Sequence, residues 1–169
     1  MLLAVLPVLT AVPFAAAAEA DQSVGGITGS CKWSYDADTL TLTISGTGQM
    51  DDYVGAFQTS APWGSLCFRK LVIEEGVTRI GFCAFQGCVN LTSIVIPENV
   101  TSIGTNAFFG CTSLTNIVIP KSVTYLGDNV YYGCTNLRSV VISKGMYLHR
   151  NDFAKCPSLT RIVIPEGVG

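Results

Sequence analysis

Four of the seven cysteines recur at a nearly constant interval along the chain. They are Cys88, Cys111, Cys134 and Cys156. Regularly spaced thiols can form disulfides, bind a metal ion or pack as small apolar groups. Zinc is not expected, because there is no CxxC pair and His149 is the single histidine. Stacked cysteines would carry parallel side chains, whereas a disulfide needs converging ones, so we expect a structural row of buried thiols.

The other three cysteines lie outside this row. Cys83 lies five residues before Cys88, in the first of a series of repeated segments described below. Cys31 and Cys67 flank the amino-terminal region. An exported chain can bridge such a pair, so Cys31 and Cys67 are candidates for a disulfide. The alternative is two free thiols.

Other polar motifs do not complete a catalytic or cofactor site. Gly46-Thr47-Gly48 lacks the third glycine of a nucleotide-binding loop, and Asp36 and Asp38 lack the remaining ligands of an EF-hand. No G-x-S-x-G motif is present. His149 has no evident partner in the sequence. We therefore predict a protein that is not an enzyme, with no catalytic, cofactor-binding or metal-binding residues and no cofactor.

An internal repeat accounts for the regular cysteine spacing. Leu91–Ser113 and Leu114–Asn136 are identical at 13 of 23 positions, without a gap. A period of 20–29 residues with regular Leu and Ile is typical of a leucine-rich solenoid. The copies are 68–90, 91–113, 114–136, 137–158, which is one residue shorter, and the partial copy 159–169.

Each copy has the pattern of a short strand followed by a return path. Ile94 and Ile96 alternate with Val95, which is the period of a strand, and Pro97 then ends it. Val100, Ile103 and Phe108 would turn inward on the way back. No coil can bury these faces alone, so stacked coils must make the core. We predict a mainly β leucine-rich-repeat solenoid, with a parallel sheet of short strands and irregular or short helical return arcs.

The chain before the repeats divides into three parts. Residues 1–20 resemble a signal peptide that is cleaved after Ala20, and the alternative is a membrane anchor. We expect residues 21–29 to be a flexible lead-in. Residues 30–67 are predicted to cap the open apolar end of the solenoid with a β-hairpin made of Cys31–Tyr35 and Thr39–Ser45.

The repeat L-x-x-I-x-I-P-x-x-V-T-x-I-G-x-x-A-F-x-x-C resembles the BspA-like, or Treponema-type, leucine-rich repeat. The segment W-x-x-x-x-x-x-L-T-L-T-I-S-G-T-G-x-M-x-D-Y, followed by A-P-W, resembles the region that precedes these repeats. The resemblance implies a secreted or surface binding protein, adhesive in some members, with no shared catalytic residue. The repeat pattern is lost at Ser143, His149 and Asp152, where we expect a looser or bulged coil. We also expect the chain to be a fragment of a longer protein.

The outward positions of the strands form the candidate partner-binding face. A valine row would be edged by hydroxyl, amide and basic side chains, and the alternative is an ordinary solvated sheet face. The face comprises Val72, Val95, Val118, Val141, Val163, Ser93, Asn116, Ser139, Arg138 and Arg161.

We therefore predict a secreted or cell-surface protein of bacterial type that binds a protein or a glycan on a host or neighbouring cell. The alternative is a structural spacer that presents another domain. A formal net charge of −2 argues against a nucleic-acid partner. After residue 20 no apolar stretch is long enough to span a membrane, and we expect a monomer.

Overall fold

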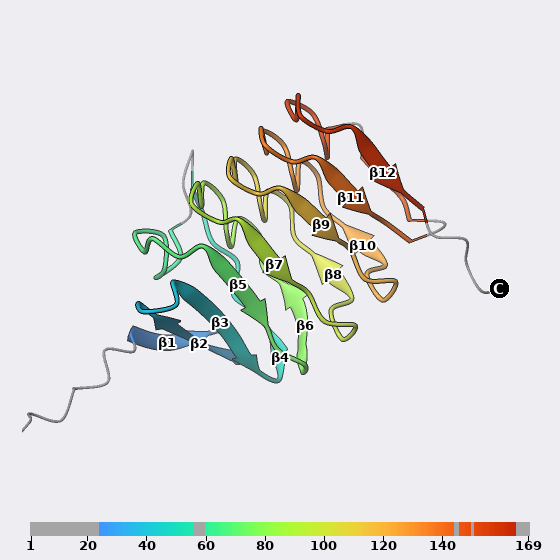
Figure 1. The fold of residues 1–169 in the computed structure, drawn as a ribbon. Helices are drawn as coiled ribbons and strands as arrows, with labels where there is room; N and C mark the ends of the chain where they lie inside the picture. The colour runs from blue at the N-terminus through green and yellow to red at the C-terminus, as the bar shows by residue number, and fades with distance from the viewer. Residues whose placement is uncertain (1–23, 56–59, 144–145, 150, 165–169) are drawn as a thin grey trace, which may run out of the picture.

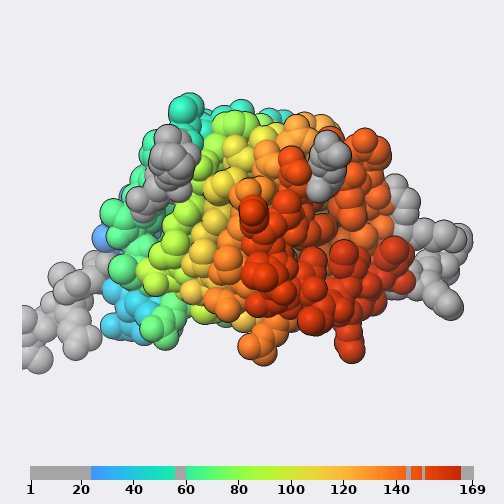
Figure 2. Space-filling model, turned by 90° about the horizontal axis from the view of Figure 1, so that it is seen from above, coloured from blue at the N-terminus to red at the C-terminus, as the bar shows by residue number. Residues whose placement is uncertain are grey.

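The computed structural model describes residues 24–55, 60–143, 146–149 and 151–164. The chain winds through coils that stack side by side, and each coil adds one strand to a row on the same face (Figure 1). Seen from above, the coils form successive colour bands (Figure 2). The regular elements in these ranges are all β-strands, as expected for a mainly β solenoid. The proposed signal peptide lies outside the described residues. Within them, no helix is long and apolar enough to cross a membrane.

The main row of strands consists of two hydrogen-bonded sheets. Strands β1, β2 and β3 pair antiparallel, and the pairings from β3 onward are parallel. The first sheet contains, in order, β1 (Val24–Thr28), β2 (Cys31–Asp36), β3 (Thr41–Gly46), β5 (Lys70–Ile73) and β7 (Ser93–Val95). The second contains β9 (Asn116–Val118), β11 (Ser139–Val141) and β12 (Arg161–Val163).

The return arcs differ from the expectation of irregular or short helical segments. They build another parallel sheet, in the order β10-β8-β6-β4. Neighbouring coils lie about one strand spacing (~4.8 Å) apart, so each short arc can satisfy its backbone groups on the next coil. The strands are β4 (Gly48–Gln49), β6 (Val77–Ile80), β8 (Ser102–Ile103) and β10 (Tyr125–Leu126).

The start of the described chain is a strand and not the expected flexible lead-in. Strand β1 pairs with β2 from Val24↔Tyr35 to Thr28↔Cys31. Its two glycines make this close approach possible, because a Cβ atom at Gly25 would lie 2.7 Å from the Trp33 carbonyl oxygen. The predicted hairpin of β2 and β3 is confirmed.

The capping segment is itself a coil in register with the repeats. Strand β3 pairs with β5, so that Thr43 lies beside Val72. Further along the cap, Trp63 begins a column of aromatic rings with centroids 5.3–5.6 Å apart. Successive rings lie in adjacent coils and fill the interior at the same repeat position. The column is Trp63, Phe85, Phe108, Tyr131 and Phe153.

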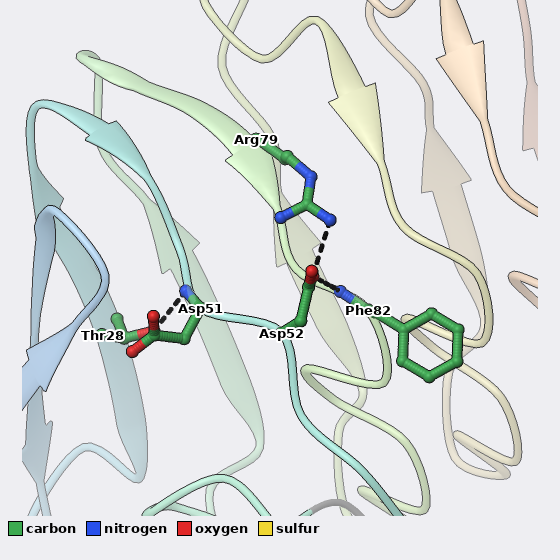
Figure 3. Close-up of polar contacts among 5 residues, drawn as sticks. All are labelled: Thr28, Asp51, Asp52, Arg79 and Phe82. Atoms are coloured by element: carbon green, nitrogen blue, oxygen red, sulfur yellow. Dashed lines mark hydrogen bonds and ion pairs between the residues drawn. The ribbon is translucent and has the colours of Figure 1, made fainter.

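Polar contacts lock the cap onto the first repeat (Figure 3). The Asp52 carboxylate accepts hydrogen bonds from the Arg79 guanidinium at 2.6 Å and from the Phe82 N–H at 2.7 Å. Partial burial raises the pKa of Asp52, but the bonds from the Phe82 N–H and the Arg79 guanidinium outweigh it and leave this pKa below its usual value. The buried Thr28 hydroxyl accepts bonds from the Asp51 N–H and the Tyr53 hydroxyl, which fastens β1 to the same segment.

Neighbouring coils stack so closely at one repeat position that only glycine fits there. A Cβ atom at Gly104 would lie 2.6 Å from the Phe82 nitrogen of the preceding coil, and one at Gly127 would collide with Thr105. A tight bend was our expected reason for glycine at these positions. The structure shows a different one, which is close contact between the backbones of neighbouring coils.

The inward positions of the repeats are buried or, like Ile94 and Ile96, half-buried against the core. The exceptions are Ile162 and Ile164 in the last described coil, which are 47% and 57% exposed.

Candidate binding face and cysteine row

The predicted binding residues lie on the outer side of the main strand row. Leu71, Ile117 and Val140 point into the core, so the alternate positions on the same strands face outward. Val72, Val141 and Val163 are half-buried, whereas Val95 is 52% exposed and Val118 is 64% exposed. The largest apolar exposure of this face is therefore at its centre.

Strand pairing aligns the valines in two groups. Val72 lies beside Val95, and Val118, Val141 and Val163 lie side by side. Between the groups, β7 and β9 are neighbours (Figure 1). They belong to separate sheets, however, because the ladder of paired residues ends at β7 and resumes at β9. The two exposed valines are on the strands that border this interruption.

Polar side chains edge the valines. Ser93, Asn116, Arg138 and Arg161 are exposed, and Ser139 is half-buried. Neighbouring coils share further bonds along this edge: the Thr92 hydroxyl donates to the Arg69 carbonyl at 3.0 Å. The face is thus an apolar centre within a rim of hydroxyl, amide and basic groups.

The same surface extends onto the cap, which sequence reasoning did not include. Thr41 and Thr43 of β3 lie beside Lys70 and Val72 in the parallel register, and both are half-buried. The alternation of threonines in this strand was visible in the sequence. Its alignment with the repeats was not, because the segment lacks the repeat motif.

The regularly spaced cysteines form a row of free thiols at the turns. Cys111, Cys134 and Cys156 are buried, and Cys88 is half-buried. The Cys111 thiol donates to the Phe85 carbonyl at 3.2 Å, and Cys134 and Cys156 make the same bond to Phe108 and Tyr131. Burial raises the pKa of Cys88 and of Cys134 to about 12, which disfavours the reactive thiolate.

Cys31 and Cys67, the candidate bridge, are free thiols that lie far apart. Cys31 pairs with Gly46 at the end of β3. Cys67 is two residues before Arg69, whose N–H bonds to the Leu40 carbonyl just before β3 begins. The two sites are therefore separated by the length of that strand, roughly 20 Å at ~3.3 Å per residue, which is too far for a disulfide.

His149 has a partner that the sequence did not identify. Its Nδ1 lies 2.7 Å from the Asp128 carboxylate, and its ring meets the exposed Tyr147 ring edge-on. Asp152 was expected to loosen this coil, yet Tyr131 and Phe153 still stack with an interplanar angle of 1°. The buried Asp152 carboxylate accepts a bond from the His149 N–H, which holds the turn. Across the described residues, no group of three or more His, Cys, Asp or Glu could hold a metal ion.

A stack of near-identical coils with a long outer sheet face defines a leucine-rich-repeat solenoid. The chain belongs to the BspA type leucine rich repeat family, whose model matches residues 60–169 in six copies. The match begins eight residues before the repeats as read from the sequence. It therefore includes Trp63, which begins the aromatic column.

Solved structures share this fold at low sequence identity. A leucine-rich repeat protein from Eubacterium ventriosum matches with a TM-score of 0.63 and 24% identity over 85% of this chain and 44% of its own. A leucine rich cell surface protein from Faecalibacterium prausnitzii matches with a TM-score of 0.65 and 22% identity, over 82% of this chain and 38% of its own. The pneumococcal vaccine antigen PcpA matches with a TM-score of 0.54 and 16% identity, over 79% of this chain and 41% of its own. The chain thus spans less than half the length of each. Among curated proteins, none matches the sequence.

Proposed function

We propose that this chain is a binding module of a secreted or surface-attached bacterial protein, and that the outer valine face contacts a protein or glycan on another cell. Three observations support the proposal. The first is the signal-like segment over residues 1–20. The second is the family membership. The third is that one protein of the same fold is described as a cell surface protein.

The observation that carries the choice of face is the exposure of Val95 and Val118 at its centre. An apolar centre surrounded by polar side chains is the usual anatomy of a protein contact surface. Solenoids present such extended faces for binding. The proposed activity is binding without catalysis.

A triple variant tests this assignment. In Val95→Glu/Val118→Glu/Val141→Glu, three carboxylates would replace the apolar centre. The readout is binding of the purified chain to surfaces coated with matrix proteins, with mucin glycans or with bacterial cells. We expect the variant to bind at least about tenfold more weakly. Tyr125→Glu is the matched control, because Tyr125 is 58% exposed on β10 of the other sheet.

Two results would overturn the proposal. If the triple variant is folded and binds as well as the unsubstituted chain, the valine face is not the contact surface. If the unsubstituted chain binds none of the coated surfaces, the spacer function is favoured instead.

A further inference from the structure

A hollow of ≈ 210 Å³ lies where the capping coil meets the first repeat, and it has a thiol from each coil on its wall. Cys67 comes from the end of the capping coil and Cys88 from the end of the first repeat. Cys67 is exposed, Cys88 is half-buried, and both are free. This hollow is separate from the valine face and takes no part in the function proposed above.

The register of the two coils brings these cysteines close together. The Leu66 N–H bonds to the Trp63 carbonyl, as the Cys88 N–H bonds to the Phe85 carbonyl, and the two rings stack. Leu66 and Cys88 are therefore equivalent positions, about one strand spacing (~4.8 Å) apart. Cys67 is the next residue, ~3.8 Å further on. Its Cα thus lies roughly 6 Å from that of Cys88, within the usual range for a disulfide.

Cys88 is also the exceptional member of the cysteine row. The thiols of Cys111, Cys134 and Cys156 each donate to a carbonyl of the preceding coil. Among the described residues, no such bond is formed by Cys88, whose preceding coil is the cap. The members of the row stack directly on one another with parallel side chains, which does not suit a disulfide. Cys67 is offset by one residue from the position that stacks on Cys88, so these two side chains can converge.

We propose that Cys67 and Cys88 form a disulfide in an oxidising compartment and so clamp the cap to the first repeat. Cys67, the exposed thiol, first attacks the disulfide of an oxidant such as oxidised glutathione, and one glutathione thiol leaves. Cys88 then loses its proton to solvent and attacks the Cys67 sulfur of this mixed disulfide, releasing the second glutathione thiol. This is the slow step, because burial disfavours the Cys88 thiolate. The two cysteines lose two protons and two electrons, and the oxidant gains them.

The test uses the full chain with oxidised glutathione as the probe. After oxidation, the remaining thiols are alkylated and the protein is digested without reduction for mass spectrometry. We expect a linked peptide pair containing Cys67 and Cys88, with the other five of the seven cysteines alkylated. Cys31→Ser is the matched control and should retain the link. In Cys88→Ser, Cys67 should remain a glutathione adduct.

Thermal unfolding gives a second readout. Oxidation should raise the midpoint of the unsubstituted chain and of Cys31→Ser, and dithiothreitol should reverse the rise. Cys67→Ser should not respond to either reagent. Recovery of Cys67 bonded to any other cysteine, or as a glutathione adduct beside an unlinked Cys88 in the unsubstituted chain, would overturn the proposal. Because no binding partner is involved, failure here leaves the proposed function untouched.

Discussion

The Trp63 ring lies 5.5 Å from the Phe85 ring at an interplanar angle of 25°, and this stack joins the cap to the repeats. Trp63 is fully buried, and its indole N–H donates to the Ala84 carbonyl at 2.9 Å. One side chain of the cap therefore supplies both the first ring of the aromatic column and a hydrogen bond to the next coil.

Trp63→Ala should strongly destabilise the protein. The substitution leaves a cavity at the end of the column and removes the bond to Ala84, so we expect a loss of about 3–5 kcal/mol in the free energy of unfolding. Denaturant titration measures it. Trp63→Phe keeps a ring but not the N–H donor, and its loss should be smaller. A change below about 1 kcal/mol for Trp63→Ala would contradict the role of this residue.

Tyr131→Phe should stabilise the protein. Tyr131 is fully buried and its hydroxyl has no hydrogen-bond partner in the described part of the chain, whereas Phe85 and Phe108 occupy the same position in earlier coils. Removing a buried unpaired hydroxyl should raise the free energy of unfolding by about 1–3 kcal/mol. Tyr132→Phe, at a half-buried neighbour, is the control and should change stability by less than about 0.5 kcal/mol. Equal effects of the two variants would count against this explanation.

Lys155→Gly should stabilise the turn at the end of the fourth repeat. Lys155 has a φ of 58°, at the repeat position where Gly110 and Gly133 have φ of 69° and 73°. A side chain disfavours this left-handed conformation, so we expect a net gain of about 0.5–1 kcal/mol after the greater freedom of unfolded glycine is included. The reverse change, Gly133→Lys, should cost a similar amount. Its Cβ atom would have space, with the nearest atom 3.9 Å away, so the cost would come from the backbone alone.

Asp152 should make stability depend on pH. Burial raises the pKa of its carboxyl, although hydrogen bonds from the His149 and Val130 N–H groups oppose the shift. The folded state therefore holds this proton more tightly than the unfolded state. The resulting stabilisation is complete below the unfolded pKa of about 3.9 and is lost as the pH rises through the raised folded value.

Asp152→Asn keeps an acceptor for the His149 N–H but cannot ionise. It should unfold at a higher temperature than the unsubstituted chain at pH ~7, and the difference should shrink toward pH ~4. Melting temperature measured against pH tests this. Asp128 and His149 are ionisable neighbours, so the comparison is repeated in a His149→Asn background. An unchanged pH profile in both backgrounds would rule out Asp152 as the source.

Within the repeats, local pattern was sufficient to predict most of the architecture. The alternation of Leu71, Val72 and Ile73 specifies an inner and an outer face because successive side chains on a strand point to opposite sides. The recurrence of Phe85 and Phe108 at one position predicts a buried column because equivalent residues of stacked coils must meet. Each of these inferences needs only the contents of one coil and the existence of a neighbour.

Outside the repeats, the same reasoning could not place the residues. Val24–Thr28 is mostly exposed and contains two glycines, so its strand exists only because β2 lies beside it. The registration of β3 with β5 likewise depends on pairing between segments about 30 residues apart. The separation of Cys67 from Cys31 follows from that same registration.

The sequence by itself determined that the chain is a solenoid of the BspA type, which residues face inward, and where the thiols and rings recur. Only the tertiary structure decided that the cap is a further coil, that the return arcs form a sheet, and that the main ladder is interrupted between Val95 and Val118. The physical reason is that periodic burial is encoded residue by residue. The pairing of non-repeated segments, and the places where neighbouring strands do not pair, depend on how whole coils fit together.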